Sequence, residues 1–158
     1  MSSHHLSLNC KNAEITAQYA QSLAQNLCPG DVVLLSGEVG VGKTHFARAL
    51  IQSLLVSPED VPSPTFTLVQ TYETIKGEVW HADLYRLMST LEIEELGLAD
   101  AFDQAICLVE WPDRLGDLTP PDALHLHLEN GAEETTRLIT ANWSDRKWKG
   151  KLTPWQTT

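Results

Sequence analysis

The segment at residues 37–44, GEVGVGKT, places three glycines, a lysine and a threonine at the spacing of a P-loop (Walker A), G-x-x-x-x-G-K-[ST]. Gly37, Gly40 and Gly42 permit backbone angles that a Cβ disfavours, so several amides can point inward as an anion nest. The positive end of the following helix dipole adds to the attraction for an anion. This chemistry suits the phosphates of a nucleoside triphosphate.

Side chains of the same segment have the groups that a magnesium-bound triphosphate needs. We expect Lys43, as a solvated lysine on a loop, to bridge the β- and γ-phosphates, and the hydroxyl of Thr44 to ligate Mg²⁺. Val41 and His45 beside them are also predicted to contact the nucleotide. The alternative is a Gly-rich strand-to-helix turn with a surface lysine, but a chance match is expected in well under about 1% of chains of this length.

Two carboxylates end apolar segments in the manner of a Walker B acid. Glu110 follows ICLV, and Asp83 follows VWHA. If these segments are strands of a parallel sheet, both acids emerge at the edge where ligands bind. We predict that they hold Mg²⁺ or polarise the attacking water; in the alternative, each is a solvated acid at a strand end. His81 and Tyr85 alternate with Asp83 and mark either a polar catalytic face or the wet side of the sheet.

The base of the nucleotide is predicted to be adenine, because the chain has no N/T-K-x-D motif that reads guanine. We expect the base or ribose near residues 9–12. The helix predicted at 13–27 must run antiparallel to the strand at 31–36, which returns the start of the helix, with Asn12, to the P-loop edge. The loop at 130–134 is a second candidate. In the alternative interpretation, Asn12 is only the helix cap.

The elements that must position these residues are visible as hydrophobic patterns. A helix at 13–27, a strand at 31–36 and a helix at 42–55 frame the P-loop. Further elements are a hairpin of 65–74 and 78–84, short acidic helices within 91–102, and strands at 105–109, 123–129 and 136–143. This order predicts an α/β fold: a P-loop NTPase-like, mostly parallel sheet flanked by helices, with antiparallel strands added in the C-terminal part.

Length and composition predict one globular domain. The 158 residues are the size of a single P-loop ATPase domain, in which 1–12 and 144–158 are expected to be terminal segments. The net charge, 11 − 21 = −10, repels polyphosphate backbones and disfavours tight, autonomous binding of nucleic acid. Three cysteines without a C-x-x-C pair, and no apolar run typical of a signal peptide or membrane span, indicate a cytoplasmic protein with reduced thiols.

Beyond the P-loop, five segments together resemble the TsaE (YjeE) family of bacterial tRNA threonylcarbamoyladenosine biosynthesis. They are GEVGVGKT at 37–44, SPTFTLVQTYE at 63–73, HADLYRL at 81–87, LEIEELGLADAF at 91–102 and ICLVEWPDR at 106–114. The resemblance implies a small P-loop ATPase whose cofactors are ATP and Mg²⁺. It also implies that Lys43 and Thr44 serve the phosphates and Mg²⁺. Glu110 is then a metal-side acid, and Asp83 is a second essential acid.

The same resemblance implies two protein partners: a kinase-like protein that transfers the threonylcarbamoyl group, and its related, non-catalytic companion. Contact with tRNA is expected to be indirect. Thr65 falls in 63–67, which resembles a switch segment. Pro62 and Pro64 restrict its backbone, and its hydroxyls suit a γ-phosphate or metal. The basic and aromatic residues at 146–151 are expected to be a solvated tail, with a contact to tRNA or an acidic partner as the alternative.

The expected activity is slow ATP hydrolysis that the partners stimulate. Two other functions stay open. A small-molecule kinase would transfer the phosphate to an acceptor, although no cluster of arginines follows the P-loop. A non-hydrolysing, nucleotide-gated adaptor would bind ATP without turning it over.

Overall fold

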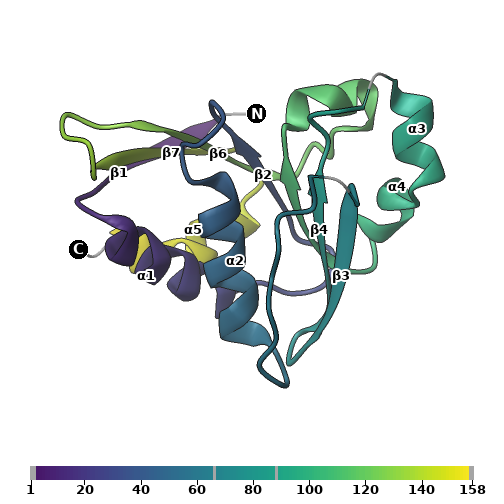
Figure 1. Ribbon diagram of the computed structural model, residues 1–158, viewed down its shortest axis with the longest axis horizontal. Coiled ribbons are helices and arrows are strands. Elements are labelled where there is room, and N and C mark those ends of the chain that lie inside the picture. The colour runs from purple at the N-terminus through teal and green to yellow at the C-terminus, as the bar shows by residue number, and fades with distance from the viewer. Residues whose placement is uncertain (1–2, 66, 88, 157–158) are drawn as a thin grey trace.

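The computed structural model describes residues 3–65, 67–87 and 89–156. They form a seven-stranded sheet in the order β1-β7-β6-β2-β5-β4-β3, with helices on both faces (Figure 1). The strands are β1 (His4–Cys10), β2 (Val32–Ser36), β3 (Val69–Thr74), β4 (Gly77–Asp83), β5 (Ile106–Glu110), β6 (Leu124–Asn130) and β7 (Arg137–Trp143). The helices are α1 (Ala13–Ala24), α2 (Lys43–Leu54), α3 (Thr90–Glu95), α4 (Leu98–Ala101), the 3₁₀ helix η1 (Pro112–Leu118), α5 (Lys147–Lys151) and α6 (Thr153–Gln156).

The central strands of the sheet, β6-β2-β5-β4, run parallel to one another. β3 pairs antiparallel with β4, which confirms the predicted hairpin. At the other edge, β7 and β1 add two further antiparallel strands. The predicted α/β class is therefore confirmed, as a mixed sheet whose antiparallel strands lie at both edges rather than only in the C-terminal part.

Strand β2 lies in the middle of the sheet because it is apolar on both faces. Val33 and Leu35 join the core formed with α1 and α2, whereas Val32 and Leu34 join a second core formed with α3 and α4. All four side chains are at most 1% exposed, as expected for a parallel strand covered by helices on both sides. No helix in the described part of the chain is long and apolar enough to span a membrane.

Helix α1 begins where the sequence predicts. The side chain of Asn12 accepts a hydrogen bond from the Ile15 amide at 2.9 Å, so Asn12 is the N-cap. The helix ends at Ala24, before the predicted end at Leu27. Its last turn instead makes hydrogen bonds to carbonyls three residues back, and this tighter winding does not continue an α-helix.

Both ends of the described chain pack into the fold. β1, which the sequence analysis did not predict, pairs with β7 along its whole length. Trp148 and Trp155, in α5 and α6, are at most 2% exposed, and their indole N–H groups donate to the carbonyls of Asp122 and Tyr19. The expectation of a solvated tail at 146–151 is therefore wrong. An indole buries a large apolar area once its single donor is satisfied.

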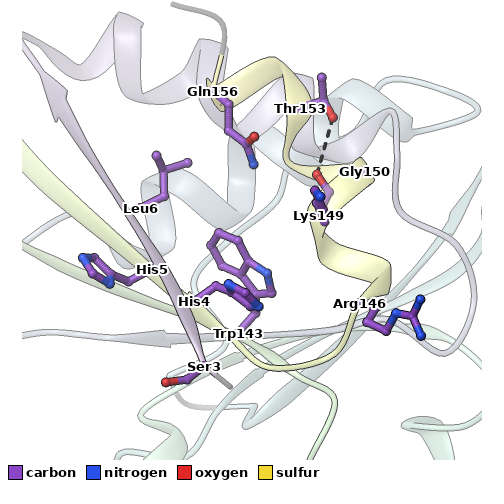
Figure 2. A pocket seen from close by; sticks show the side chains of 10 residues that line it. All are labelled: Ser3, His4, His5, Leu6, Trp143, Arg146, Lys149, Gly150, Thr153 and Gln156. Atoms are coloured by element: carbon purple, nitrogen blue, oxygen red, sulfur yellow. Dashed lines mark hydrogen bonds between the residues drawn. The ribbon is translucent and has the colours of Figure 1, made fainter. Parts of the chain in front are cut away.

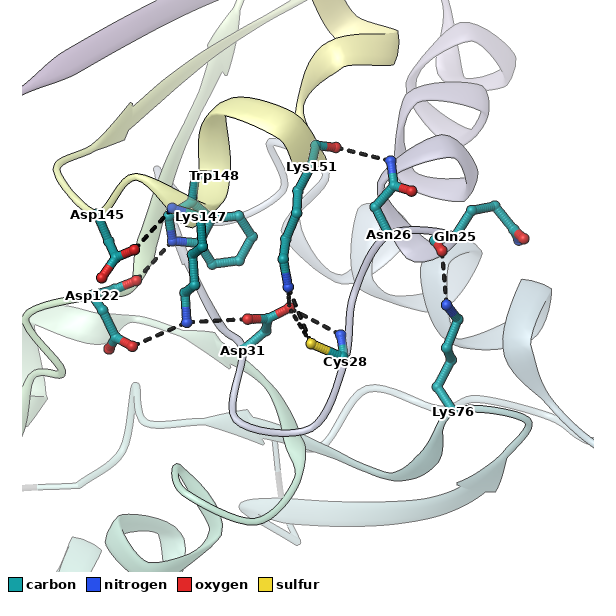
Figure 3. A network of polar contacts seen from close by, with 10 residues as sticks. All are labelled: Gln25, Asn26, Cys28, Asp31, Lys76, Asp122, Asp145, Lys147, Trp148 and Lys151. Atoms are coloured by element: carbon teal, nitrogen blue, oxygen red, sulfur yellow. Dashed lines mark hydrogen bonds and ion pairs between the residues drawn. The ribbon is translucent and has the colours of Figure 1, made fainter.

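A buried carboxylate connects this C-terminal segment to the start of β2 (Figure 3). Asp31, 2% exposed, accepts hydrogen bonds from Lys151, from Lys147 at 3.1 Å and from the Cys28 amide at 2.9 Å. Lys147 also pairs with Asp122 at 3.0 Å. Burial raises the pKa of the Asp31 carboxyl, but the two lysines and the Cys28 amide outweigh it and hold the pKa below its ordinary value. Asp31 is therefore charged at neutral pH and ties α5 to the sheet.

Asp31→Asn should destabilise the fold by about 3 kcal/mol near neutral pH, because it leaves Lys151 without its charged partner and Lys147 with Asp122 alone. The folded-state pKa of Asp31 is lowered, so its contribution is present above the ordinary value of 3.8 and is lost as pH falls through the folded value. The difference in free energy of unfolding between variant and wild type should therefore shrink in strong acid. Urea unfolding followed by tryptophan fluorescence near neutral pH and in acid measures both effects.

The control for this experiment is Asp117→Asn, at an exposed position of η1, where a surface substitution is expected to change stability by no more than about 0.5 kcal/mol. Equal stability of Asp31→Asn and wild type near neutral pH would contradict the prediction. A difference in free energy of unfolding that stays constant through the acid range would contradict it as well.

Candidate functional site

The loop between β2 and α2, residues 37–42, has the left-handed glycine backbone that the P-loop pattern predicts. Gly37 and Gly42 have φ of 138° and 110°, which side chains rarely permit. At Gly37 a Cβ would also lie 2.3 Å from the carbonyl oxygen of Leu128. The loop can therefore follow this path against β6 only with glycine at that position.

Lys43, the first residue of α2, reaches back over this loop. Its Nζ donates to the carbonyls of Gly37 and Glu38, the latter at 3.0 Å, and lies 3.9 Å from the ring centroid of Trp111. Lys43 is 5% exposed, so the expectation of a solvated lysine is wrong. Burial lowers the pKa of Lys43, and nearby carboxylates oppose this shift only in part; they belong to Glu110, Asp83 and Asp113. The loop carbonyls thus accept the hydrogen bonds of the buried ammonium.

A chain of hydrogen bonds joins α2 to β5 and β4. The hydroxyl of Thr44 donates to the carboxylate of Glu110, at 2.9 and 3.0 Å from its two oxygens. From the other side, Nε2 of His81 lies 2.7 Å from Oε2 of Glu110. His81 and Glu110 are 0% and 2% exposed, and within the described structure Nδ1 of His81 has no hydrogen-bond partner. His81 therefore belongs to the polar interior of the site, not to a wet side of the sheet.

Asp83 ends β4 as Glu110 ends β5, and the two acids are partners in the parallel register. Oδ2 of Asp83 accepts a hydrogen bond from the Thr65 hydroxyl at 3.1 Å, and Oδ1 accepts one from the Tyr85 amide at 2.9 Å. The hydroxyls of Thr65 and Ser63 are 2.7 Å apart. Asp83 is 5% exposed. The acids thus share the predicted edge of the sheet, and the alternative of solvated strand-end acids is wrong.

Trp111 covers this edge from a conformation that is rare for a residue with a side chain. Its φ is 60°, in the left-handed region. The ring lies beneath the ammonium of Lys43 and 4.7 Å, centroid to centroid, from the ring of Tyr85. Strained backbone of this kind concentrates at functional sites. The turn after β5 therefore brings Trp111 to the P-loop lysine, and Tyr85, just after β4, packs against its ring.

Two cavities collect the predicted binding residues. The first, of about 370 Å³, is lined by Val39, Gly40, Gly42, Lys43, Thr44, Thr65, Asp83, Tyr85, Glu110 and Trp111. The second, of about 690 Å³, is lined by Asn12, Ala13, Glu14, Thr16, Val41, Gly42, His45, Glu134, Thr135 and Arg137. Gly42 lines both cavities. The individually predicted binding residues all line one or the other, except Gly37, which contacts Lys43 instead. Of the segments 9–12 and 130–134, only Asn12 and Glu134 do.

The second cavity brings together the two segments predicted to lie near the base. Asn12 belongs to the first segment and Glu134 to the second, and both line the cavity. Nε2 of His45 lies 2.9 Å from the carbonyl oxygen of Ala13, which holds the start of α1 against the first turn of α2. The expected return of α1 to the P-loop edge is therefore confirmed.

Arg137 is a site residue that sequence reasoning missed. Its Nε donates to the carbonyl of Val41 at 3.1 Å, and its Nη1 donates to the carbonyl of Glu134 at 2.7 Å. It thus links the P-loop backbone to the loop before β7. No motif marked Arg137, because the contact depends on the path of β7 and not on any local pattern.

Comparison with known proteins agrees with the fold and the motifs. Residues 10–139 match the family model described as threonylcarbamoyl adenosine biosynthesis protein TsaE. The chain is 42% identical, over 118 residues, to the tRNA threonylcarbamoyladenosine biosynthesis protein TsaE of Rickettsia felis, covering 75% of this chain and 69% of the relative. It is 34% identical, over 124 residues, to the Bacillus subtilis protein of the same name, covering 78% and 77%.

Among solved structures, the crystal structure of Bacillus subtilis YdiB matches this one with a TM-score of 0.79 at 25% identity. The match covers 99% of this chain and 97% of that one, so the P-loop NTPase-like fold extends over nearly the whole molecule. The family model, the curated relatives and the solved structure agree. The chain belongs to the TsaE family of tRNA threonylcarbamoyladenosine biosynthesis proteins.

Proposed function

We propose that this chain is the cytoplasmic ATPase component of the assembly that places threonylcarbamoyl on the adenosine beside the tRNA anticodon. It binds MgATP and hydrolyses it slowly alone, and faster with two partners, a kinase-like transferase and its non-catalytic companion. The observation that carries the proposal is the contact between the hydroxyl of Thr44 and the carboxylate of Glu110. A P-loop ATPase needs its loop hydroxyl and its strand-end acid at one place to hold Mg²⁺.

The first cavity suits a triphosphate because the ammonium of Lys43 already lies over the glycine loop. Lys43 donates to two neutral loop carbonyls, and anionic phosphate oxygens can replace them as acceptors, so that both partners of each hydrogen bond are ionised. The start of α2 adds backbone amides and the positive end of its dipole. These groups neutralise and orient the terminal phosphate for attack by water.

Thr44, Glu110 and Asp83 are the residues that would hold or serve Mg²⁺. All three offer oxygen, the donor that Mg²⁺ prefers, and all line the first cavity. When bound, the ion neutralises charge that develops on the phosphate oxygens. Glu110 lies on the metal side because it contacts Thr44. Asp83, which Thr65 joins to the predicted switch segment, polarises the attacking water.

The second cavity suits adenine and ribose, because it continues from the phosphate cavity at Gly42. Asn12 and Glu134 offer side-chain donors and acceptors there. Arg137 holds the Val41 carbonyl on the P-loop side and the Glu134 carbonyl on the other, so it keeps the two walls of the cavity together. In this arrangement the polar groups around the cavity recognise adenine, and the chain needs no guanine-reading motif.

Nucleotide turnover, measured with and without the two partner proteins and tRNA, tests the function. We expect hydrolysis, in which water attacks ATP and free phosphate is released. The chain alone should hydrolyse ATP slowly, and the full assembly should do so several-fold faster. Transfer of the phosphate to a small acceptor would instead show a kinase. Tight binding of ATP without turnover in the full assembly would show a nucleotide-gated adaptor. Either of these two outcomes contradicts the proposal.

Lys43→Ala should weaken MgATP binding by roughly tenfold to a hundredfold, since charge-assisted hydrogen bonds contribute about 1.5–3 kcal/mol each. Isothermal titration calorimetry measures the affinity, and circular dichroism checks that the variant is folded. Lys76→Ala, in the turn between β3 and β4, removes the same charge outside both nucleotide cavities and serves as the control. Unchanged affinity in folded Lys43→Ala would refute the assignment of the phosphate site.

His81 should affect hydrolysis only through Glu110. His81→Ala is expected to lower turnover of the assembly by roughly tenfold to a hundredfold, as is typical of a group that orients a metal-binding side chain. The affinity for ATP should change little. Glu110→Ala should also lower turnover, and adding His81→Ala to it should cost little more, because the two residues act as a unit.

Two further measurements separate this positioning role from a general loss of structure. The Mg²⁺ concentration that gives half-maximal turnover should rise in His81→Ala and recover in part in His81→Gln, whose amide can still donate to the carboxylate. His125→Ala, at an exposed position of β6 outside both nucleotide cavities, is the control. Independent, additive losses in the double variant would show that His81 does not act through Glu110.

A further inference from the structure

A groove of about 1290 Å³ lies between the start of β1 and the C-terminal helices (Figure 2). We call it the terminal groove; the residues used below are His4, Trp143, Arg146, Lys149, Thr153 and Gln156. It shares no lining residue with the two nucleotide cavities. The proposed ATPase function therefore gives it no role.

The fold separates the basic residues of the C-terminal segment into two pairs. Four of the eleven lysines and arginines of the chain lie at 146–151. Lys147 and Lys151, one helical turn apart, form ion pairs with Asp31, and Lys147 also pairs with Asp122 (Figure 3). Arg146 and Lys149 are exposed, line the terminal groove (Figure 2) and form no ion pair with any described carboxylate. Lys147 and Lys151 thus have a structural role, whereas Arg146 and Lys149 face solvent in the terminal groove.

The terminal groove is positive although the protein is acidic. No aspartate or glutamate is among the residues that line it, whereas the whole chain has a net charge of −10. Cations in a concave surface concentrate the local field and attract anions. The net charge argued against contact with nucleic acid, but that argument does not apply to this groove, because no acidic residue lines it.

Aromatic rings lie beside these cations. The imidazole of His4 stacks on the indole of Trp143, with ring centroids 5.8 Å apart and planes inclined by 26° (Figure 2). The two residues are register partners in β1 and β7, so the backbone fixes their alignment. Trp143 is 7% exposed, whereas His4 is exposed. His4 is therefore a ring platform, supported from beneath, on which another planar group can stack.

We propose that the terminal groove binds a single-stranded segment of RNA. Arg146 and Lys149 contact successive phosphates, and one base stacks on His4; this combination of cations and rings is how proteins hold single strands without reading sequence. Thr153 and Gln156 add polar groups to the wall opposite β1. RNA is the relevant polymer because the relatives of this chain are tRNA threonylcarbamoyladenosine biosynthesis proteins. An acidic peptide would use the two cations and leave the stacked rings without a function, so RNA is favoured.

Fluorescence anisotropy with a fluorescein-labelled oligoadenylate of about twelve nucleotides, within the length range of single-strand sites, tests this proposal. The full chain carries Lys43→Ala, so that the P-loop does not capture the probe. We expect saturable binding at low salt. Its log affinity should fall with log salt with a slope of about −1.4, which is about −0.7 for each of two phosphate contacts.

Charge reversals identify the surface that binds. Lys149→Glu or Arg146→Glu should each lower the affinity about tenfold and reduce the slope to about −0.7, because one phosphate contact is lost. Lys76→Glu changes the net charge equally, away from the terminal groove, and should change the affinity less than about twofold if site contacts and not net charge decide binding. His4→Ala should lower the affinity about fivefold or more while the slope stays unchanged, since stacking releases no counterions.

Three results would overturn the proposal. The first is the absence of saturable binding at low salt. The second is an equal loss of affinity in Lys76→Glu and Lys149→Glu, which would mean that only net charge matters. The third is full displacement of the probe by an oligoglutamate of equal charge, together with no effect of His4→Ala. That result would identify a surface for an acidic peptide.

Discussion

The buried carboxylate of Glu110 is the interaction on which the arrangement of the site depends. A carboxylate that is 2% exposed is costly unless hydrogen bonds replace its water. Thr44 from α2 and His81 from β4 supply them, and Glu110 itself ends β5. These bonds therefore fix the P-loop helix relative to two parallel strands. A shift of α2 along the sheet would leave a buried charge without partners, which is why the loop, the acid and the helix form one rigid unit.

Strand β2 joins this unit to the C-terminal segment. The end of β2 leads into the loop at 37–42, and Asp31, just before its start, holds Lys147 and Lys151. Since both faces of β2 are buried, neither end can move without disturbing the two cores. The attachment at Asp31 also sets the rotation of α5. Arg146 and Lys149 consequently face the terminal groove and not the internal network, and a basic surface arises on an acidic protein.

The parts of the fold that were predictable are those in which a local pattern and the tertiary environment agree. The apolar run of β2 is buried on both faces, and the hairpin of β3 and β4 forms around its predicted turn. Glu110 and Asp83 meet because parallel strands end at one edge of a sheet, a rule of topology that needs no coordinates. β1 was missed because its partner β7 is distant in the sequence, so the pairing leaves no local trace.

By itself, the sequence determined the loop type, the family resemblance and the strand-end acids, because each depends on residues adjacent along the chain or on a simple rule of strand order. Only the tertiary structure decided that Lys43 is buried over Trp111, that His81 supports Glu110 and that Arg137 holds the P-loop backbone. It also decided that the C-terminal tryptophans belong to the core. These are contacts between segments far apart in the sequence, and burial, which sets their strength, is a property of the assembled fold and not of any local pattern.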